Sequence, residues 1–445
     1  MHDALDLREL LADEVVQQRE SGHDVSGIEP EIRAALDGDA KLSEVEELYD
    51  RLLELPRGAG WPYEEPSTWP EIEALLPAGD PATPSGAVDD ATLADRLRAA
   101  WLGRCAGCNL GKPVEGFTPE QIRRYLELAG AWPLDDYVPA LDPMPEGLAL
   151  RQCWTETTRG HISHMARDDD IDYTILALHI LESHGFGFGT EDVAAEWLDN
   201  LPFTQTYTAE RVAYRNLVHN LRPPATATHR NPYREWIGAQ IRGDLWGYVS
   251  PAAPRRAVEL ACRDAVLSHV ANGIYGELWA AALLAASFTA ADARAALERS
   301  LEHVPPRSRL AEALRDVLDL HARGDLTWQQ ARDQVEARYG HYHWVHTINN
   351  AAVVAVALLW GEGDFGRTVG LAVQAGWDTD CNGATAGSVF GALHGSAALP
   401  ERFVAPLSDR IRSSVGEFDN ARISDLADRT FRLAHQGARS PIRGT

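Results

Sequence analysis

The sequence predicts an all-α protein, and three observations lead to that prediction. Most segments from Asp90 onward have apolar residues at helical spacing. No run alternates apolar and polar residues in the way a half-buried strand does. Residues 171–185 and 349–363 are apolar on nearly all sides, which is typical of helices buried inside a domain. We therefore expect residues 91–445 to form one helical domain.

The first 90 residues differ from the rest. Residues 7–21 and 42–55 have apolar residues at helical spacing with charges between them, which predicts a small helical extension over residues 1–78. Residues 79–90 are rich in Pro, Gly and Asp and have the composition of a linker. We expect the extension to be separable from the domain that follows it.

Six further amphipathic or apolar segments continue the helical pattern along the body. They are residues 91–107, 257–270, 276–288, 292–304, 309–324 and 327–340. No simple repeat relates them. Their number and length favour a compact bundle of helices.

Glycines recur every fourth residue in two segments. A glycine inside a helix costs about 1 kcal/mol relative to alanine, so such a pattern needs a compensating contact. Residues four apart share one helix face, where missing side chains let another backbone approach closely. We expect the two faces to pack against each other and to bring Glu115 and Asp378 into one pocket. The glycines are Gly103, Gly107 and Gly111, and Gly383, Gly387, Gly391 and Gly395.

Composition argues against several classes of partner. The 445 residues include 41 basic and 66 acidic side chains, a net charge of −25, which disfavours nucleic acid. The apolar stretch at residues 351–360 is too short for a membrane span, and the acidic N-terminus has no signal-peptide core. We expect a cytoplasmic protein with no membrane partner. Five cysteines imply no disulfide framework.

A run of carboxylates precedes the buried helix predicted at residues 171–185. Asp168, Asp169 and Asp170 are adjacent, and Asp172 follows. Adjacent carboxylates repel one another, and they are tolerated at a helix N-terminus or around a cation. Capping of the helix by Asp169 or Asp170 and binding of a cation both remain open.

A second acidic pair precedes the second glycine segment. Asp378 and Asp380 alternate with Thr379 and Cys381. Carboxylates separated by one residue can point to the same side of an extended turn and ligate Mg²⁺ or Mn²⁺. The alternative is again a capped helix. The two acidic groups together could form one binuclear metal site.

Other candidates give weaker signals. Glu115 lies in a Pro/Gly turn, where a surface position is the default. Cys105 and Cys108 have no partner pair for zinc, and buried thiols are the favoured interpretation. The histidines at 341, 343 and 346 favour hydrogen-bonding roles over metal binding. No phosphate-binding loop, dinucleotide fingerprint or nucleophile elbow is present.

Taken in chain order, these segments resemble the ADP-ribosylglycohydrolase family. That family has a glycine-rich helix ending in a G-x-P-x-E turn, here LGRCAGCNLGKPVEG. A T/S-D-D-T motif follows, here DDDIDYT, and then G-G-D-T-D-T-N/A, here GWDTDCNGATAG. The resemblance covers about residues 92–400 and implies a compact orthogonal all-α bundle that holds two Mg²⁺ or Mn²⁺ ions.

The resemblance also implies roles for individual residues. Asp380 would bridge the metals, and Glu115 would be the family's mobile glutamate at the substrate. Glu115 and Asp169 are the candidate catalytic bases, and His269 would lie near the ribose. The implied metal ligands are Asp168, Asp169, Asp170, Asp378, Asp380 and Cys381. The implied substrate loop is Gly243, Asp244, Leu245, Trp246, Gly247 and Tyr248.

The sequence departs from the family pattern in the middle loop, which has Leu245, Trp246 and Tyr248 in place of an M-R pair, and at three positions of the motifs. Asp168 stands where the family has Thr or Ser, and Ile171 stands where it has Thr. Cys381 replaces the last Thr of the third motif, and sulfur is a softer ligand than Mg²⁺ prefers. Either one metal site is altered or Cys381 turns away from it.

The leading hypothesis is a metal-dependent glycohydrolase that cleaves a ribosyl bond of the ADP-ribosyl type at the anomeric carbon. The substrate is a small molecule or a protein-linked ribosyl group. One alternative is an N-riboside hydrolase acting on a nucleoside or a dinucleotide-derived metabolite. Another is a non-catalytic binding protein that keeps the fold, although the intact Asp378, Asp380 and Glu115 weigh against it.

Overall fold

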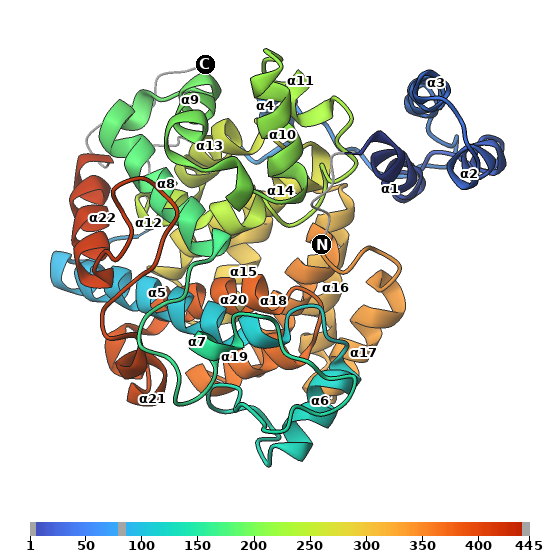
Figure 1. Ribbon diagram of the computed structural model, residues 1–445. Helices are drawn as coiled ribbons and strands as arrows, with labels where there is room; N and C mark the ends of the chain where they lie inside the picture. The colour runs from blue at the N-terminus through green and yellow to red at the C-terminus, as the bar shows by residue number, and fades with distance from the viewer. Residues whose placement is uncertain (1–5, 79–85, 438–445) are drawn as a thin grey trace.

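The computed structural model describes residues 6–78 and 86–437 (Figure 1). Within these residues the chain forms 22 α-helices and several short 3₁₀ turns, and its only β-type pairings are isolated bridges. The all-α prediction is confirmed. Most of the predicted linker, residues 79–85, lies outside the described residues.

The extension contains four helices. Figure 1 shows the first three as a small group beside the body, and α4 lies against the body itself. The apolar side chains of the first three helices, including Leu10, Leu11 and Tyr49, form a core of their own that is completed by Tyr233 and Trp236 of the body. The helices are α1 Leu7–Glu20, α2 Glu29–Asp37, α3 Leu42–Leu53 and α4 Trp69–Leu75.

Buried ion pairs join the extension to the body. Arg234 pairs with Glu14 at 2.7 Å, and Arg309 pairs with Glu65 at 2.9 Å. Arg309 also pairs with Glu235 of the body at 2.7 Å. A buried charge that loses its partner is strongly destabilising. The boundary at residue 78 stays a prediction, but the two parts share an interface that the sequence did not indicate.

The body consists of the remaining helices. They are α5 Asp90–Gly111, α6 Pro119–Leu128, α7 Trp154–Thr157, α8 Asp169–His184, α9 Thr190–Asn200, α10 Thr208–Val218, α11 Ala225–Thr228, α12 Asp244–Tyr248, α13 Pro254–Ala265, α14 Ala271–Ser287, α15 Ala293–Leu301, α16 Arg309–Ala322, α17 Trp328–Tyr339, α18 Thr347–Trp360, α19 Phe365–Gln374, α20 Thr379–His394, α21 Glu401–Val404 and α22 Ile423–Gly437. Every residue of α14 and α18 is buried, as expected for helices that are apolar all round. No helix in the described part of the chain has the length and apolar character that a membrane crossing requires.

The two glycine segments pack against each other. A Cβ atom on Gly103 would overlap the carbonyl group of Gly387, and one on Gly107 would overlap that of Gly383. The partners run in opposite directions along the chain, so α5 and α20 are antiparallel, with backbone against backbone. This confirms the predicted close packing. Gly395 is the exception, because it ends α20 at a φ of 77°.

The antiparallel pairing positions the site. It places the C-terminal end of α5 beside the N-terminal end of α20, and the Thr379 hydroxyl donates a hydrogen bond to the Gly111 carbonyl at 2.8 Å. The first turn of α8 reaches the same place, where Arg104 of α5 binds the carbonyl of Asp170. Three segments far apart in sequence therefore meet at one point.

Candidate active site

A cavity of about 280 Å³ opens where these three segments meet. This volume is close to the lower end of the ~300–1,000 Å³ typical of small-molecule sites. Its lining includes six residues that the sequence singled out: Glu115, Asp168, Asp169, Asp378, Asp380 and Cys381. Asp170 is 1% exposed and lies just beneath them. The prediction that Glu115 and Asp378 share a pocket is confirmed.

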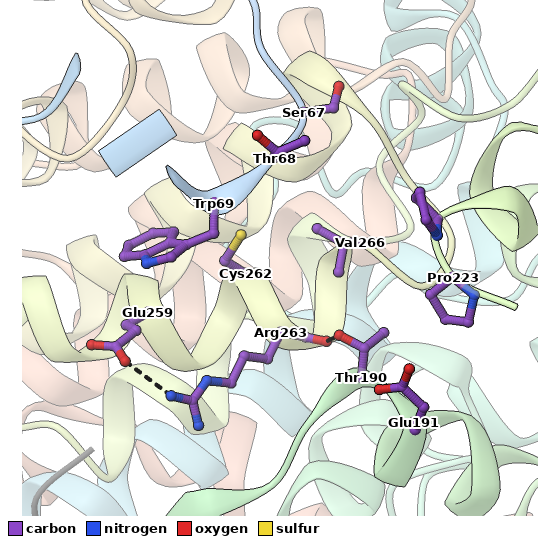
Figure 2. Close-up of a pocket in the computed structure, with 11 residues that line it drawn as sticks. Ser67, Thr68, Trp69, Thr190, Glu191, Pro223, Glu259, Cys262, Arg263 and Val266 are labelled. Carbon is purple, nitrogen blue, oxygen red and sulfur yellow. Dashed lines mark hydrogen bonds and ion pairs between the residues drawn. The ribbon is translucent and has the colours of Figure 1, made fainter. Parts of the chain in front are cut away.

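A second cavity, of about 310 Å³, lies between α4, α9 and α13 (Figure 2). Its two carboxylates, Glu191 and Glu259, are far apart in sequence, and Glu259 is already paired with Arg263 at 2.9 Å. The two acidic motifs do not reach it. The chemistry suggested by the sequence therefore belongs to the first cavity.

The start of α8 explains the first acidic cluster. Asp168 caps the helix by accepting a hydrogen bond from the backbone N–H of Asp170 at 2.9 Å. The cap is thus Asp168 and not Asp169 or Asp170, which occupy the first turn. The helix dipole favours negative charge here. Because Asp168 alone meets the capping requirement, Asp169 and Asp170 are left for another role.

Asp172 has a structural role. Its carboxylate accepts hydrogen bonds from Arg167 at 2.8 Å, from the Ser413 hydroxyl at 2.6 Å and from the Ser414 backbone at 2.9 Å. These contacts tie α8 to the loop before α22. They leave this carboxylate outside the cavity.

The second acidic pair is held by an amide network at the start of α20. The side-chain oxygen of Asn350, on α18, accepts hydrogen bonds from the Asp378 backbone at 3.2 Å and from the Asn382 side chain at 2.8 Å. Trp377, just before, has a φ of 62°, which bends the chain sharply into the helix. The turn directs Asp378 and Asp380 toward the cavity.

Glu115 enters the cavity from the end of α5. A single 3₁₀ turn, Lys112–Val114, separates it from the helix. The Arg151 guanidinium binds the Glu115 backbone carbonyl at 2.9 Å and lies 3.5 Å from its carboxylate. The Glu115 side chain is 30% exposed, so it remains accessible to a substrate. Lys112, three residues earlier, binds the carboxylate of Asp168.

Burial raises the pKa of four carboxyl groups in the cluster, and repulsion from a neighbouring aspartate raises each of them further. These groups are Asp169, Asp170, Asp378 and Asp380. Burial also raises the pKa of Glu115 to about 8, with Asp380 adding to the effect and Arg151 opposing it. A cation bound among these groups would relieve their repulsion.

Asp168 is the exception. Burial would raise its pKa, but the Lys112 ammonium and Arg167 hold the pKa of Asp168 below its ordinary value. Asp168 is therefore charged in the folded protein. Its negative charge is already balanced by an ammonium of the chain.

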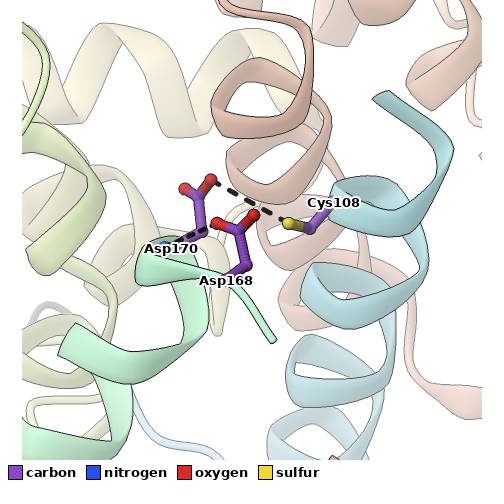
Figure 3. A group of neighbouring side chains, drawn as sticks. All are labelled: Cys108, Asp168 and Asp170. Carbon is purple, nitrogen blue, oxygen red and sulfur yellow. Dashed lines mark hydrogen bonds between the residues drawn. The ribbon is translucent and has the colours of Figure 1, made fainter. Parts of the chain in front are cut away.

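Two sets of donor atoms have the spacing of a metal site. The first is Cys108, Asp168 and Asp170, and Figure 3 shows the Cys108 thiol directed at Asp170, 3.9 Å from its carboxylate. The second is Asp170, Asp380 and Cys381. Within each set the donor atoms lie within 4.8 Å of one another. Oxygen and sulfur donors at this spacing fit a divalent cation.

This part of the chain is similar to known proteins. A family model described as ADP-ribosylglycohydrolase matches residues 89–440. The chain belongs to the ADP-ribosylglycohydrolase family. It is therefore a hydrolase that acts on glycosidic bonds, with the all-α fold of that family.

One similar solved structure is described as an "ADP-ribosylglycohydrolase-related protein complex". It is 20% identical, covers 77% of this chain and 99% of its own chain, and has a TM-score of 0.42. No protein in a search of curated sequences matches this chain. The matched family region begins one residue before α5, so it leaves out the extension.

The predicted substrate loop of this glycohydrolase lies elsewhere. Residues 243–248 are buried and absent from the cavity lining. The Trp246 indole donates to Glu277 at 2.9 Å, and the Tyr248 hydroxyl lies 2.6 Å from that of Ser388. The structure therefore does not bring Gly243, Asp244, Leu245, Trp246, Gly247 or Tyr248 to this cavity. His269 is also buried and outside the lining, and its nearest carboxylate is Glu210, 4.0 Å away.

Asp244 instead contributes to the acidic cluster indirectly, through Arg104. It pairs at 2.8 Å with Arg104, which is completely buried. Arg104 in turn donates to the backbone carbonyls of Asp170, at 2.6 Å, and Ile241, at 2.7 Å. The loop thus neutralises the arginine that fixes the first turn of α8. Its contribution to the site is structural.

Several residues of the lining were not predicted. Lys112 is one of only two lysines in the chain and lies three residues from Glu115, a signal that could have drawn attention to it. Trp344 lies in the histidine-rich segment that we expected to make hydrogen bonds. His346 of that segment does so, capping α18 through its ring nitrogen at 3.2 Å. Arg151 and Tyr207 belong to no recognisable pattern.

Proposed function

We propose that this family member is a divalent-metal-dependent glycohydrolase that cleaves a ribosyl bond at the anomeric carbon. The observation that supports this most directly is the convergence of Glu115 with both acidic motifs on one cavity. A group of buried carboxylates with raised pKa values is unstable without a compensating cation or proton. Binding a cation and handling protons are the two functions that such a site serves in glycoside hydrolysis.

The residues divide into two groups. Asp170, Asp380 and Cys381 would hold a divalent ion, which when bound supplies Lewis-acid polarisation of an oxygen on the ribose or of water. Asp169 and Glu115 line the cavity and are only partly buried, so they can reach the substrate. Their carboxylates would accept the proton of the attacking water and stabilise the positive charge that develops at the anomeric carbon.

A specific observation favours the N-riboside alternative. Each cationic side chain of the lining already faces a carboxylate: Lys112 faces Asp168, Arg151 faces Glu115, and Arg167 faces Asp172. A diphosphate is usually bound by arginines or backbone N–H groups that are free to point at it. Tyr207 and Trp344 instead offer aromatic walls to a base. The proposal therefore includes an N-riboside as well as an ADP-ribosyl group as the substrate.

The test is product analysis by mass spectrometry. Protein that has been freed of metal by a chelator is incubated with ADP-ribosylated peptides and with a panel of ribosides. The incubation is repeated after Mg²⁺, Mn²⁺ or Zn²⁺ is added. Release of ADP-ribose supports the first substrate class, and release of a free base supports the second. Asp380→Asn should abolish turnover, whereas Asp425→Asn, at the exposed first turn of α22, should not. Metal-independent turnover, or none with any substrate, contradicts the proposal.

A further inference from the structure

Lys112 introduces a cation of the chain itself into the acidic cluster. It follows α5 directly, and its side chain is only 16% exposed. Its ammonium binds the Asp168 carboxylate. It therefore occupies space beside one of the carboxylates that the family resemblance assigns to metal.

The two donor sets differ in what already contacts them. In the first, the Asp168 carboxylate is bound by Lys112 and also caps α8. In the second, Asp380 forms no ion pair with any lysine or arginine of the described residues, and Cys381 is 8% exposed at the base of the cavity. Asp170 belongs to both sets, and the Arg104 guanidinium lies 3.4 Å from its carboxylate in each case. A dication in the first set would have to approach an ammonium already bound to one of its three ligands, and like charges repel strongly in a buried site.

We propose that this protein binds one divalent ion, in the set formed by Asp170, Asp380 and Cys381, and that the Lys112 ammonium takes the place of a second ion. The inference rests on the metal dependence proposed above. The sulfur of Cys381 directs the choice of ion toward a softer dication such as Zn²⁺, since Mg²⁺ prefers oxygen ligands only. Asp168 then serves as the counter-ion of Lys112.

The number of bound ions tests the proposal without measuring turnover. The full-length, metal-free chain is titrated with Zn²⁺ and, separately, with Mn²⁺, and calorimetry and native mass spectrometry count the ions. We expect one ion per wild-type chain and two per Lys112→Met chain. Lys41→Met removes the other lysine, which is exposed at the start of α3, and should keep one ion. If circular dichroism shows Lys112→Met to be unfolded, Lys112→Gln replaces it.

A Co²⁺ spectrum tests the ligand set. Co²⁺ bound to a thiolate has a sulfur-to-metal charge-transfer band, so we expect this band in the wild type and its loss in Cys381→Ser. Cys262→Ser alters a buried thiol of α13 outside the cluster and should keep the band. Zn²⁺ affinity should fall by at least about tenfold in Cys381→Ser alone.

Three results would overturn the inference: two ions in the wild type, a single ion in both Lys112 variants, or a charge-transfer band that survives Cys381→Ser. Failure of the proposed function has a different signature. A wild-type chain that holds one ion but releases no ribosyl product contradicts the function and leaves the inference standing. A wild-type chain that holds two ions and cleaves a riboside contradicts the inference and supports the proposed function.

Discussion

The contact between α5 and α20 predicts that adding a single methyl group to Gly387 destabilises the protein. A Cβ atom at this position would overlap the carbonyl carbon and oxygen of Gly103. These are backbone atoms inside a helix, so they cannot rotate away as the end of a side chain can. Gly387→Ala therefore requires the two helices to separate, and that movement also displaces the turns carrying Glu115 and Asp378.

The expected magnitude is the difference between two opposing effects. Overpacking of a core costs about 1–3 kcal/mol, and a clash with backbone belongs at the upper end, about 3 kcal/mol. Replacing a helical glycine by alanine stabilises the helix by about 1 kcal/mol. The net expectation is a loss of about 2 kcal/mol. At a surface glycine with no such contact, replacement by alanine would instead increase the stability.

Thermal unfolding followed by circular dichroism measures this difference. At about 2 °C per kcal/mol, the Tm of Gly387→Ala should fall by about 4 °C. The matched control is Gly187→Ala, because a Cβ there meets nothing within 4 Å and its φ is not positive. That variant should be stabilised by about 0.4–1 kcal/mol. A Tm for Gly387→Ala that equals or exceeds the wild-type value would refute the close-packing argument.

Three further predictions concern charged groups. Asp380→Asn should lose most of the affinity for a divalent ion while keeping the wild-type helical content, as measured by calorimetry and circular dichroism. Arg309→Met should destabilise the protein by about 3–5 kcal/mol in urea unfolding, since it leaves Glu65 and Glu235 buried without their partner. Burial, helped by Glu235, raises the pKa of Glu20 to about 7, so the folded chain keeps a proton that the unfolded chain has lost. Stability should therefore fall as pH rises from about 4.5 to 7, by no more than about 3 kcal/mol, and Glu20→Gln should flatten that slope; an unchanged slope would contradict the assignment.

Features encoded by local spacing could be predicted from the sequence. Glycines four residues apart restrict what a helix face can contact, so the packing of α5 on α20 follows from the pattern itself. Adjacent aspartates are rare inside a fold, and both acidic motifs proved to line one cavity. Buried helices such as α18 are recognisable because no face of them is polar.

Features that depend on pairing distant residues could not be predicted. Lys112 and Asp168 are 56 residues apart, and nothing in either segment indicates the other. The family resemblance assigned residues 243–248 to a substrate loop, and they lie outside the lining of this cavity. Residues 244–248 instead form a short helix that fits against α14, where a Cβ on Gly247 would overlap Leu284.

The ion pairs between extension and body also determine the order in which the chain can complete its fold during synthesis. Glu65 leaves the ribosome 244 residues before Arg309, its partner. At about 5–20 residues per second, this interval is about 12–50 s. Until Tyr233 and Trp236 are made, within this interval, the apolar face that the extension will place against them has nothing to cover it. The extension is synthesised before the residues it packs against. The apolar face of the extension is therefore exposed on the nascent chain, where chaperones can bind it, until those residues have been made.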